Sequence, residues 1–281
     1  MTHLRARLVA LRYFLATAWP IVLITAIGLV IAYQFVAPEP QRRLILTTGN
    51  DSGAYHAYAQ RYATWMAAKG VTLEVRTSPG SLENLRRVAQ GEADVGFAQA
   101  GSAVPAEADS SPTTLRSLGS VSYEPVWVFY RGDRSINKLY QLQGLRVAVG
   151  EEGSGIRGLA LQLLEVNDIK PDDPHLLPLA GLNAAEALQQ GQIDAAFIVA
   201  AQEAPVVQVL LRSPGVRVVS FSQVDAYLRR FPFLSRVVLP RGVVDLVRDL
   251  PPDDTVLLAT TANVVTRDDL HPALASLLLQ A

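Results

Sequence analysis

The stretch GEADVGF at residues 91–97 determines the expected fold, because it recurs as GQIDAAF at residues 191–197, 100 residues further along the chain. In both copies a glycine ends a helical pattern, and an aspartate precedes a short apolar run typical of a buried strand. Loops rich in glycine and serine precede the two copies in the same order, at 49–53 and 150–155. Two copies are too few for a solenoid, so the sequence predicts two lobes built on one plan, with one cleft between them.

The residues around these copies alternate between short apolar strands and amphipathic helices. Strands are expected at 43–48, 71–76, 94–98, 145–149 and 193–199, and the helical patterns between them stop at glycines. This alternation is typical of the α/β fold class.

The N-terminal segment contains no charged residue in the 24 positions from Tyr13 to Val36. As a helix this segment would extend about 36 Å, which is enough to cross a hydrocarbon core of roughly 30 Å. Arg5, Arg7 and Arg12 precede it, so the positive-inside bias places the N-terminus in the cytoplasm. Residues 1–41 are therefore expected to form a cytoplasmic end, a transmembrane anchor and a spacer. The expected location is the inner (cytoplasmic) membrane, single-pass, with the body in the periplasm.

A cleaved signal peptide is the alternative for the same segment. Cleavage needs small residues one and three places before the cut, whereas the bulky Phe35 lies two places before Ala37. We therefore expect the segment to be retained as an anchor.

The composition argues against several functional classes. With 25 Lys and Arg against 26 Asp and Glu, the net charge of −1 offers no basic surface for nucleic acid. The chain has no cysteine, and its four histidines have no partner at metal-ligand spacing. The run GSGIRG at 153–158 matches a dinucleotide fingerprint, but no acidic residue ends the next expected strand to hold a ribose. We expect no cofactor, no metal and no enzymatic activity.

Three glycine and serine pairs lie at expected helix starts, namely Ser52–Gly53, Gly80–Ser81 and Ser154–Gly155. Exposed N–H groups and the positive end of the helix dipole favour an anion there, and glycine lets a ligand approach the backbone. Ordinary helix capping by serine is the alternative. Arg157, in the first turn of the third helix, would supply a positive charge to an anionic ligand, unless it only pairs with a neighbouring glutamate on the surface.

Five stretches carry a resemblance to the TAXI family, the TRAP-associated extracytoplasmic immunogenic solute receptors. They are LTTGNDSGAYHAYA, VRTSPGSLENLRRVAQGEADVGFAQA, LRVAVGEEGSGIR, ALQQGQIDAAFIV and RFPFLSRVVLPRGVVDL. The resemblance extends from about Leu44 to Ala281 and is most specific in the second stretch, which contains Ser81 and Asn84. This chain departs from the family at Ile156, where a threonine is usual.

The resemblance implies a periplasmic-binding-protein fold of type II, with two hinge strands. It also implies small carboxylate ligands, such as amino acids or dicarboxylates, and a pair of transporter membrane subunits as partners. On this basis we expect a first lobe at 42–124 with 259–281 and a second lobe at 125–258. The strands that cross between the lobes are expected near 124–130 and 257–264.

The candidate ligand-binding residues face the expected cleft. They are Ser52, Gly53, Tyr55, Ser81, Asn84, Gln99, Ser154, Gly155, Ile156 and Arg157. The expected function is that of a solute receptor for a TRAP-type (tripartite) secondary transporter. A membrane-anchored sensory ectodomain is the alternative, because a permanent anchor is atypical for a receptor that diffuses in the periplasm.

Overall fold

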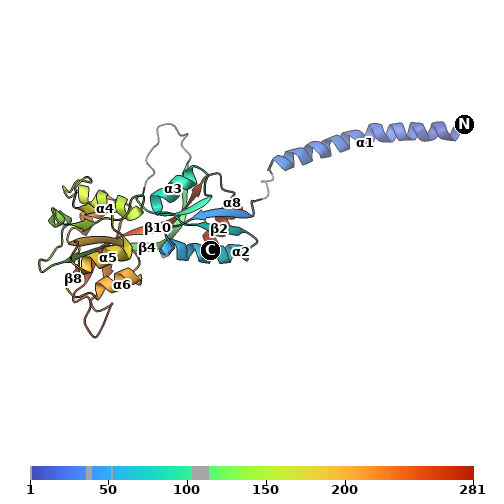
Figure 1. Ribbon diagram of the computed structural model, residues 1–281. Coiled ribbons are helices and arrows are strands. Elements are labelled where there is room, and N and C mark those ends of the chain that lie inside the picture. Colours follow the sequence, from blue (N-terminus) through green and yellow to red (C-terminus); the bar gives the residue numbers. More distant parts are fainter. Residues whose placement is uncertain (1, 36–39, 52, 103–113) are drawn as a thin grey trace. The chain divides into compact units, whose positions relative to one another are not determined.

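The computed structural model describes residues 2–35, 40–51, 53–102 and 114–281, and the chain separates into two units at residue 41 (Figure 1). In the first unit, helix α1 (Thr2–Phe35) is long and apolar enough to cross a membrane from Arg12 to Ile31, by its length and composition. None of the described side chains in this window is buried within the protein. An anchor and a signal sequence share these properties, so the retention of α1 stays a prediction.

The second unit is built on one mixed β-sheet. The strands follow the order β2-β1-β3-β10-β4-β7-β5-β6, while β8 pairs with β4 and β9 pairs with β10. In chain order the strands are β1 (Arg43–Thr47), β2 (Thr72–Arg76), β3 (Val95–Gln99), β4 (Leu115–Arg131), β5 (Val147–Ala148), β6 (Leu176–Leu177), β7 (Ala195–Val199), β8 (Val216–Val218), β9 (Ser235–Leu239) and β10 (Thr255–Arg267).

Four helices connect the parallel strands of the two lobes, as the alternating sequence pattern predicts. They are α2 (Ala54–Ala67), α3 (Ser81–Ala89), α4 (Gly155–Glu165) and α5 (Gly181–Gln189). The other helices of this unit are α6 (Pro205–Leu211), α7 (Val224–Arg230) and α8 (Pro272–Gln280), with a 3-10 turn η1 (Leu139–Leu142). Strand β1 runs parallel to β2 and β3, and β5 runs parallel to β6 and β7.

Strands β4 and β10 connect the two lobes. They pair antiparallel from Leu115 opposite Arg267 to Val126 opposite Leu258. Strand β10 also pairs with β3 in the first lobe, and β4 also pairs with β7 in the second lobe. Both expected crossing strands are therefore present and are longer than predicted. The body therefore has the expected α/β architecture with two lobes joined by two strands.

The sequence repeat is also a structural repeat. Helix α3 and strand β3 have the same bounds as helix α5 and strand β7 once the numbering is displaced by 100 residues. Asp94 accepts a hydrogen bond from the backbone N–H of Ile45 at 2.7 Å, and Asp194 accepts one from Arg146 at 2.8 Å. Each aspartate thus ties the start of its own strand to the neighbouring parallel strand of the same lobe.

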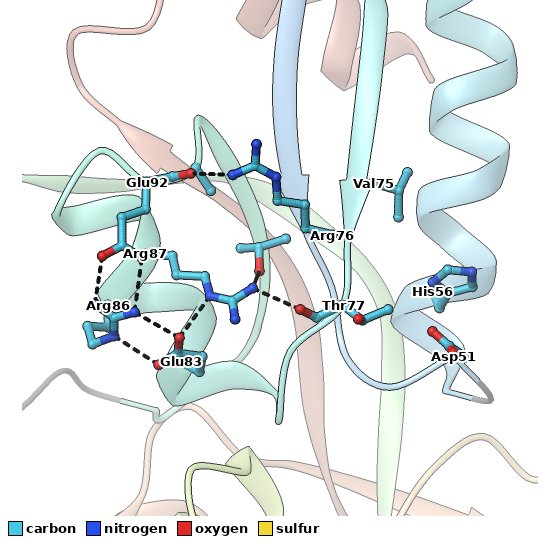
Figure 2. A pocket seen from close by; sticks show the side chains of 11 residues that line it. Asp51, His56, Val75, Arg76, Thr77, Glu83, Arg86, Arg87 and Glu92 are labelled. Atoms are coloured by element: carbon cyan, nitrogen blue, oxygen red, sulfur yellow. Dashed lines mark hydrogen bonds and ion pairs between the residues drawn. The ribbon is translucent and has the colours of Figure 1, made fainter.

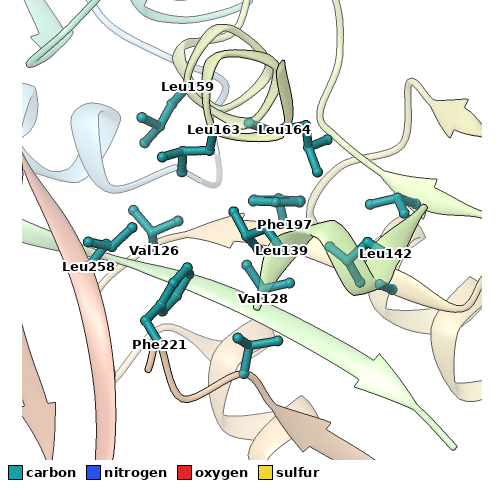
Figure 3. Close-up of a cluster of buried hydrophobic side chains, with 14 of the residues drawn as sticks. Val126, Val128, Leu139, Leu142, Leu159, Leu163, Leu164, Phe197, Phe221 and Leu258 are labelled. Carbon is teal, nitrogen blue, oxygen red and sulfur yellow. The ribbon is translucent and has the colours of Figure 1, made fainter. Parts of the chain in front are cut away.

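Strand β4 separates two hydrophobic cores in the second lobe, because successive side chains of a strand point to opposite faces of the sheet. Val126 and Val128 pack with Phe197 and helix α4 on one face, as Figure 3 shows. Trp127 and Phe129 pack against helices α5 and α6 on the other face. The first lobe has its own clusters. Each described cluster draws its residues from one expected lobe, and the exact lobe boundaries stay a prediction.

Candidate functional site

The candidate residues lie at the carboxyl ends of parallel strands. In the first lobe, the loops after β1 and β2 lead into helices α2 and α3, and Gln99 is the last residue of β3. In the second lobe, the loop after β5 leads into α4. Ligands of open α/β sheets bind outside the carboxyl ends of the strands, so this edge is where a ligand site is expected.

The N-terminal ends of α3 and α4 meet where the two lobes are in contact. A methyl group placed on Gly155 would lie 2.6 Å from the hydroxyl oxygen of Ser81 and 3.0 Å from the side-chain oxygen of Gln99. A methyl group placed on Gly80 would lie 3.4 Å from the backbone of Ser154. Ser81 and Gln99 are only 2% and 4% exposed. The structure thus brings four of the predicted residues together across the lobe contact.

A buried carboxyl group belongs to the same region. Glu124 on β4 is 7% exposed, and its Oε2 accepts a hydrogen bond from the Tyr55 hydroxyl at 3.1 Å. Burial raises the pKa of Glu124 to about 7, and the hydrogen bond from Tyr55 opposes this increase. Burial also raises the pKa of Tyr55 well above its usual value, the charge of Glu124 adds to the increase, and a hydrogen bond with the Ser81 side chain opposes it. The Tyr55 hydroxyl therefore interacts with Glu124, and the Ser81 side chain acts on the pKa of the same hydroxyl.

Gln99 completes this set of contacts. Its backbone N–H donates to Ser81 Oγ at 3.0 Å, and its side-chain oxygen lies beside Gly155. Its amide nitrogen, Nε2, is buried and has no hydrogen-bond partner among the residues that the structure describes. Because an unsatisfied buried donor costs about 1–3 kcal/mol, the Gln99 amide is a candidate for a ligand contact. We call Glu124, Tyr55, Ser81 and Gln99 the buried polar series.

Asn84 is engaged inside the first lobe instead. Its Nδ2 donates to the backbone oxygens of Thr48 and Phe97, at 2.5 and 2.7 Å. Its Oδ1 accepts from the hydroxyl groups of Thr47 and Ser78, at 2.6 and 2.7 Å. These four hydrogen bonds use the full capacity of a carboxamide. Asn84 thus joins three segments of the first lobe, and its direct contact with a ligand stays a prediction.

The loop before α4 is held by its own hydrogen bonds. Ser154 Oγ donates to the backbone oxygen of Glu151 at 2.6 Å and accepts from the backbone N–H of Arg157 at 3.3 Å, so Ser154 caps the helix. The half-buried Arg157 donates through Nη1 to the backbone oxygen of Gly150 at 3.4 Å. Within the described part of the chain it forms no ion pair. Ile156 is half-buried and packs against the second-lobe core.

The first glycine loop is described only in part. Ser52 lies outside the described residues. Gly53 precedes α2 in an extended conformation, and its N–H donates to the backbone oxygen of Asn50 at 3.0 Å. Tyr55, in the first turn of α2, is the residue of this loop region that reaches the buried polar series.

A separate cavity of about 680 Å³ opens in the first lobe beside α3 and β2 (Figure 2). Most of its charged side chains form ion pairs: Glu83 contacts Arg86 and Arg87, each at 2.8 Å, and Glu92 contacts Arg86 at 3.0 Å. Opposite charges that compensate each other leave little to attract an ion. None of the described candidate residues lines this cavity, so the lobe contact remains the stronger candidate site.

Glu124 is not among the residues predicted from the sequence. It begins the apolar part of the crossing strand, directly before Pro125. The signal that could have identified it is a single carboxyl group next to an apolar run that is expected to be buried. A charged side chain is almost never fully buried without a partner, so such a residue is a candidate for a specific role.

Comparison with known proteins gives a family match and a fold. The model of the NMT1-like family matches residues 46–281. The alkanesulfonate-binding protein SsuA from Xanthomonas axonopodis pv. citri, bound to MOPS, is similar with a TM-score of 0.49 and 17% identity, over 86% of this chain and 71% of that chain. A protein from Bordetella bronchiseptica RB50 is similar with a TM-score of 0.54 and 15% identity, over 85% of this chain and 69% of that chain.

An ancestral arginine-binding protein bound to arginine is also similar, with a TM-score of 0.51 and 14% identity, over 85% of this chain and 90% of that chain. At identities this low, the Bordetella and ancestral structures establish the fold alone. The body therefore shares the two-lobed architecture of periplasmic solute-binding proteins.

Proposed function

Because the chain belongs to the NMT1-like family and has the periplasmic-binding-protein fold, we propose that it is an extracytoplasmic solute receptor. It captures a small carboxylate ligand, of the amino acid or dicarboxylate class, between its lobes. It then delivers the ligand to the membrane subunits of a TRAP-type secondary transporter, a partnership that rests on the TAXI resemblance. The observation that carries the proposal is the contact of the α3 and α4 N-termini across the lobes.

The start of α4 is suited to an anion for two reasons. The first N–H groups of a helix have no partner inside the helix, and the dipole places partial positive charge there. The Arg157 guanidinium lies in the same turn and has no acidic partner within the described residues. A carboxylate can accept a forked pair of hydrogen bonds from a guanidinium, which a lysine ammonium does not reproduce.

The test begins with the ligand. Native mass spectrometry of the full chain, purified in mild detergent without additives, should show a bound acid. A thermal-shift screen of amino acids, dicarboxylates and alkanesulfonates follows, because a sulfonate presents the same negative charge.

Arg157→Ala should then weaken binding of the best acid by about 10- to 150-fold, the effect of losing a hydrogen bond to a charged group, while the ligand-free chain keeps its melting temperature. Arg157→Lys should restore only part of the affinity. Arg212→Ala, on an exposed face of the second lobe, is the matched control. An unchanged dissociation constant in Arg157→Ala, or a bound ligand without an acidic group, would contradict the anion site.

A sensory ectodomain is the second candidate, and helix α1 is the observation that favours it. A permanent tether suits a protein that reports a bound ligand to a membrane partner. Cross-linking of the full chain in its native membrane separates the two functions. Large transporter subunits in the cross-linked product support the first, and a kinase or cyclase supports the second.

A further inference from the structure

We propose that the buried polar series is an amine-recognition subsite, in which the Glu124 carboxylate, held by Tyr55, receives a protonated amine of the ligand. This subsite presupposes the receptor function proposed above. It narrows the ligand to molecules that carry an amine in addition to an acid, and it makes Glu124 the residue that selects them.

The first step concerns the charge of Glu124. It is buried, yet no lysine, arginine or histidine pairs with it among the described residues. Its one hydrogen bond there comes from the neutral Tyr55 hydroxyl to Oε2, which leaves Oε1 as an acceptor. A buried carboxylate without a cation is costly, and a cation that enters the site removes much of the cost. A ligand ammonium is such a cation.

The second step concerns the protonation state. Tyr55 donates its hydrogen bond to Glu124, which favours the ionised carboxylate, whereas burial favours the neutral acid. The pKa of Glu124 therefore lies near neutral pH, and a ligand ammonium beside it can shift the carboxyl group fully to its charged form. A neutral Glu124 that donates to a second ligand carboxylate is the competing chemistry, and the experiment below separates the two.

The third step concerns the distance between the two ends of the ligand. The series runs from Glu124 through Tyr55 and Ser81 to Gln99, whose side-chain oxygen lies beside Gly155 at the start of α4. An acid at α4 and an amine at Glu124 would therefore place both charged groups of the ligand along this one series. The Gln99 amide nitrogen, which has no partner among the described residues, belongs to the same series and can donate to a ligand oxygen. The close contact at Gly155 means that the lobes separate to admit the ligand.

The experiment compares acids that differ only by an amine, using the full chain in nanodiscs at pH 8. The probes are L-glutamate with glutarate, L-norvaline with valerate, and taurine with ethanesulfonate. In each pair that binds, isothermal titration should show that the acid with the amine has a dissociation constant about 10- to 150-fold lower than the acid without it. This is the effect expected for a charged hydrogen bond. Glu124→Gln should reduce this preference to near unity without weakening the acid that lacks an amine. Glu165→Gln, on the exposed end of α4, should keep the wild-type preference.

The outcomes distinguish the subsite from the receptor function. If no acid binds the wild-type chain, with or without an amine, the receptor function fails. If both members of each binding pair bind equally, or if the acid without the amine binds more tightly, the receptor function stands and the amine subsite is overturned. If Glu124→Gln does not fold, the preference of the wild-type chain decides the question, and Glu124→Asp, which keeps the charge, should retain it in part.

Discussion

Glu124 makes the stability of the body depend on pH. Its pKa is about 7 in the folded chain, above the ordinary value of 4.5. Between these two values the folded state holds the proton more tightly than the unfolded state, so the free energy of unfolding falls as pH rises. The decrease amounts to at most about 3 kcal/mol and is complete above pH 7.

Chemical denaturation of the ligand-free chain at several pH values measures this effect. The difference in stability between Glu124→Gln and the wild type should grow in favour of the variant from pH 4.5 to 7. Denaturation curves that keep a constant separation across this range would show that Glu124 titrates normally.

Asn84 supports the first lobe through its four hydrogen bonds. Replacing it with alanine removes all four of these hydrogen bonds from a buried position. We expect Asn84→Ala to lower the free energy of unfolding by about 3 kcal/mol or more. Asn183→Ala, on the exposed face of α5, is the matched control and should change it by less than about 0.5 kcal/mol. Unfolding in urea compares the two, and equal midpoints would contradict this role.

The position equivalent to Asn84 in the repeat is Ala184, which is fully buried in the second-lobe core. The helix–strand unit α3–β3 in the first lobe is therefore equivalent to α5–β7 in the second lobe. At this position hydrogen bonds stabilise the first unit, and apolar packing stabilises the second. We expect Ala184→Asn to destabilise the second lobe, because the amide would be buried among apolar side chains.

At the scale of elements, the contact between α3 and α4 depends on the absence of a side chain at Gly155. Its backbone is in a conformation that other residues adopt, so Gly155→Ala should fold. The added methyl group would meet Ser81 Oγ at 2.6 Å and force the two helix ends apart. We expect a more open arrangement of the lobes and at least about tenfold weaker ligand binding.

Distance measurements between spin labels can test this expectation, because the chain has no native cysteine to interfere. Labels at Ala68→Cys and Lys170→Cys report on one exposed position in each lobe. Gly155→Ala should lengthen the distance between the labels. Gly158→Ala is the control on the same helix, since a methyl group there meets nothing within 4 Å. Identical distances in both variants would count against a closure contact at Gly155.

Much of this element structure could be predicted from the sequence. The helix and strand around each repeated aspartate were predictable because the glycine stop, the aspartate and the apolar run are all local signals. The meeting of Ser81, Gln99 and Gly155 could be expected once the fold placed their loops at one sheet edge.

Two features depended on partners distant in sequence and could not be predicted. Tyr55 lies 69 residues before Glu124, and only the folded chain shows that burial and this single donor set the chemistry of the carboxyl group. The four hydrogen bonds of the Asn84 amide likewise come from three other segments of the chain.

At the scale of the whole molecule, we expect an N-in, C-out topology with α1 retained. The expectation follows from Arg5, Arg7 and Arg12 ahead of the apolar segment. Protease added to intact spheroplasts should degrade the body, and sequencing of the mature protein should find the N-terminal residues before position 37. A protected body would reverse the topology, and a mature chain that starts after residue 37 would identify α1 as a signal sequence.

The way β10 completes the first lobe has a consequence for biogenesis. Strand β3 pairs with β10 through contacts such as Gln99 with Ala262, so the first lobe lacks a central strand until the last part of the chain has been made. Because a chain is made from its N-terminus, β3 is synthesised before β10, and its edge stays unpaired while the second lobe is made. Long-range pairing of this kind slows folding and leaves strand edges open to aggregation. The first lobe can therefore reach its final sheet only after β10 has been synthesised.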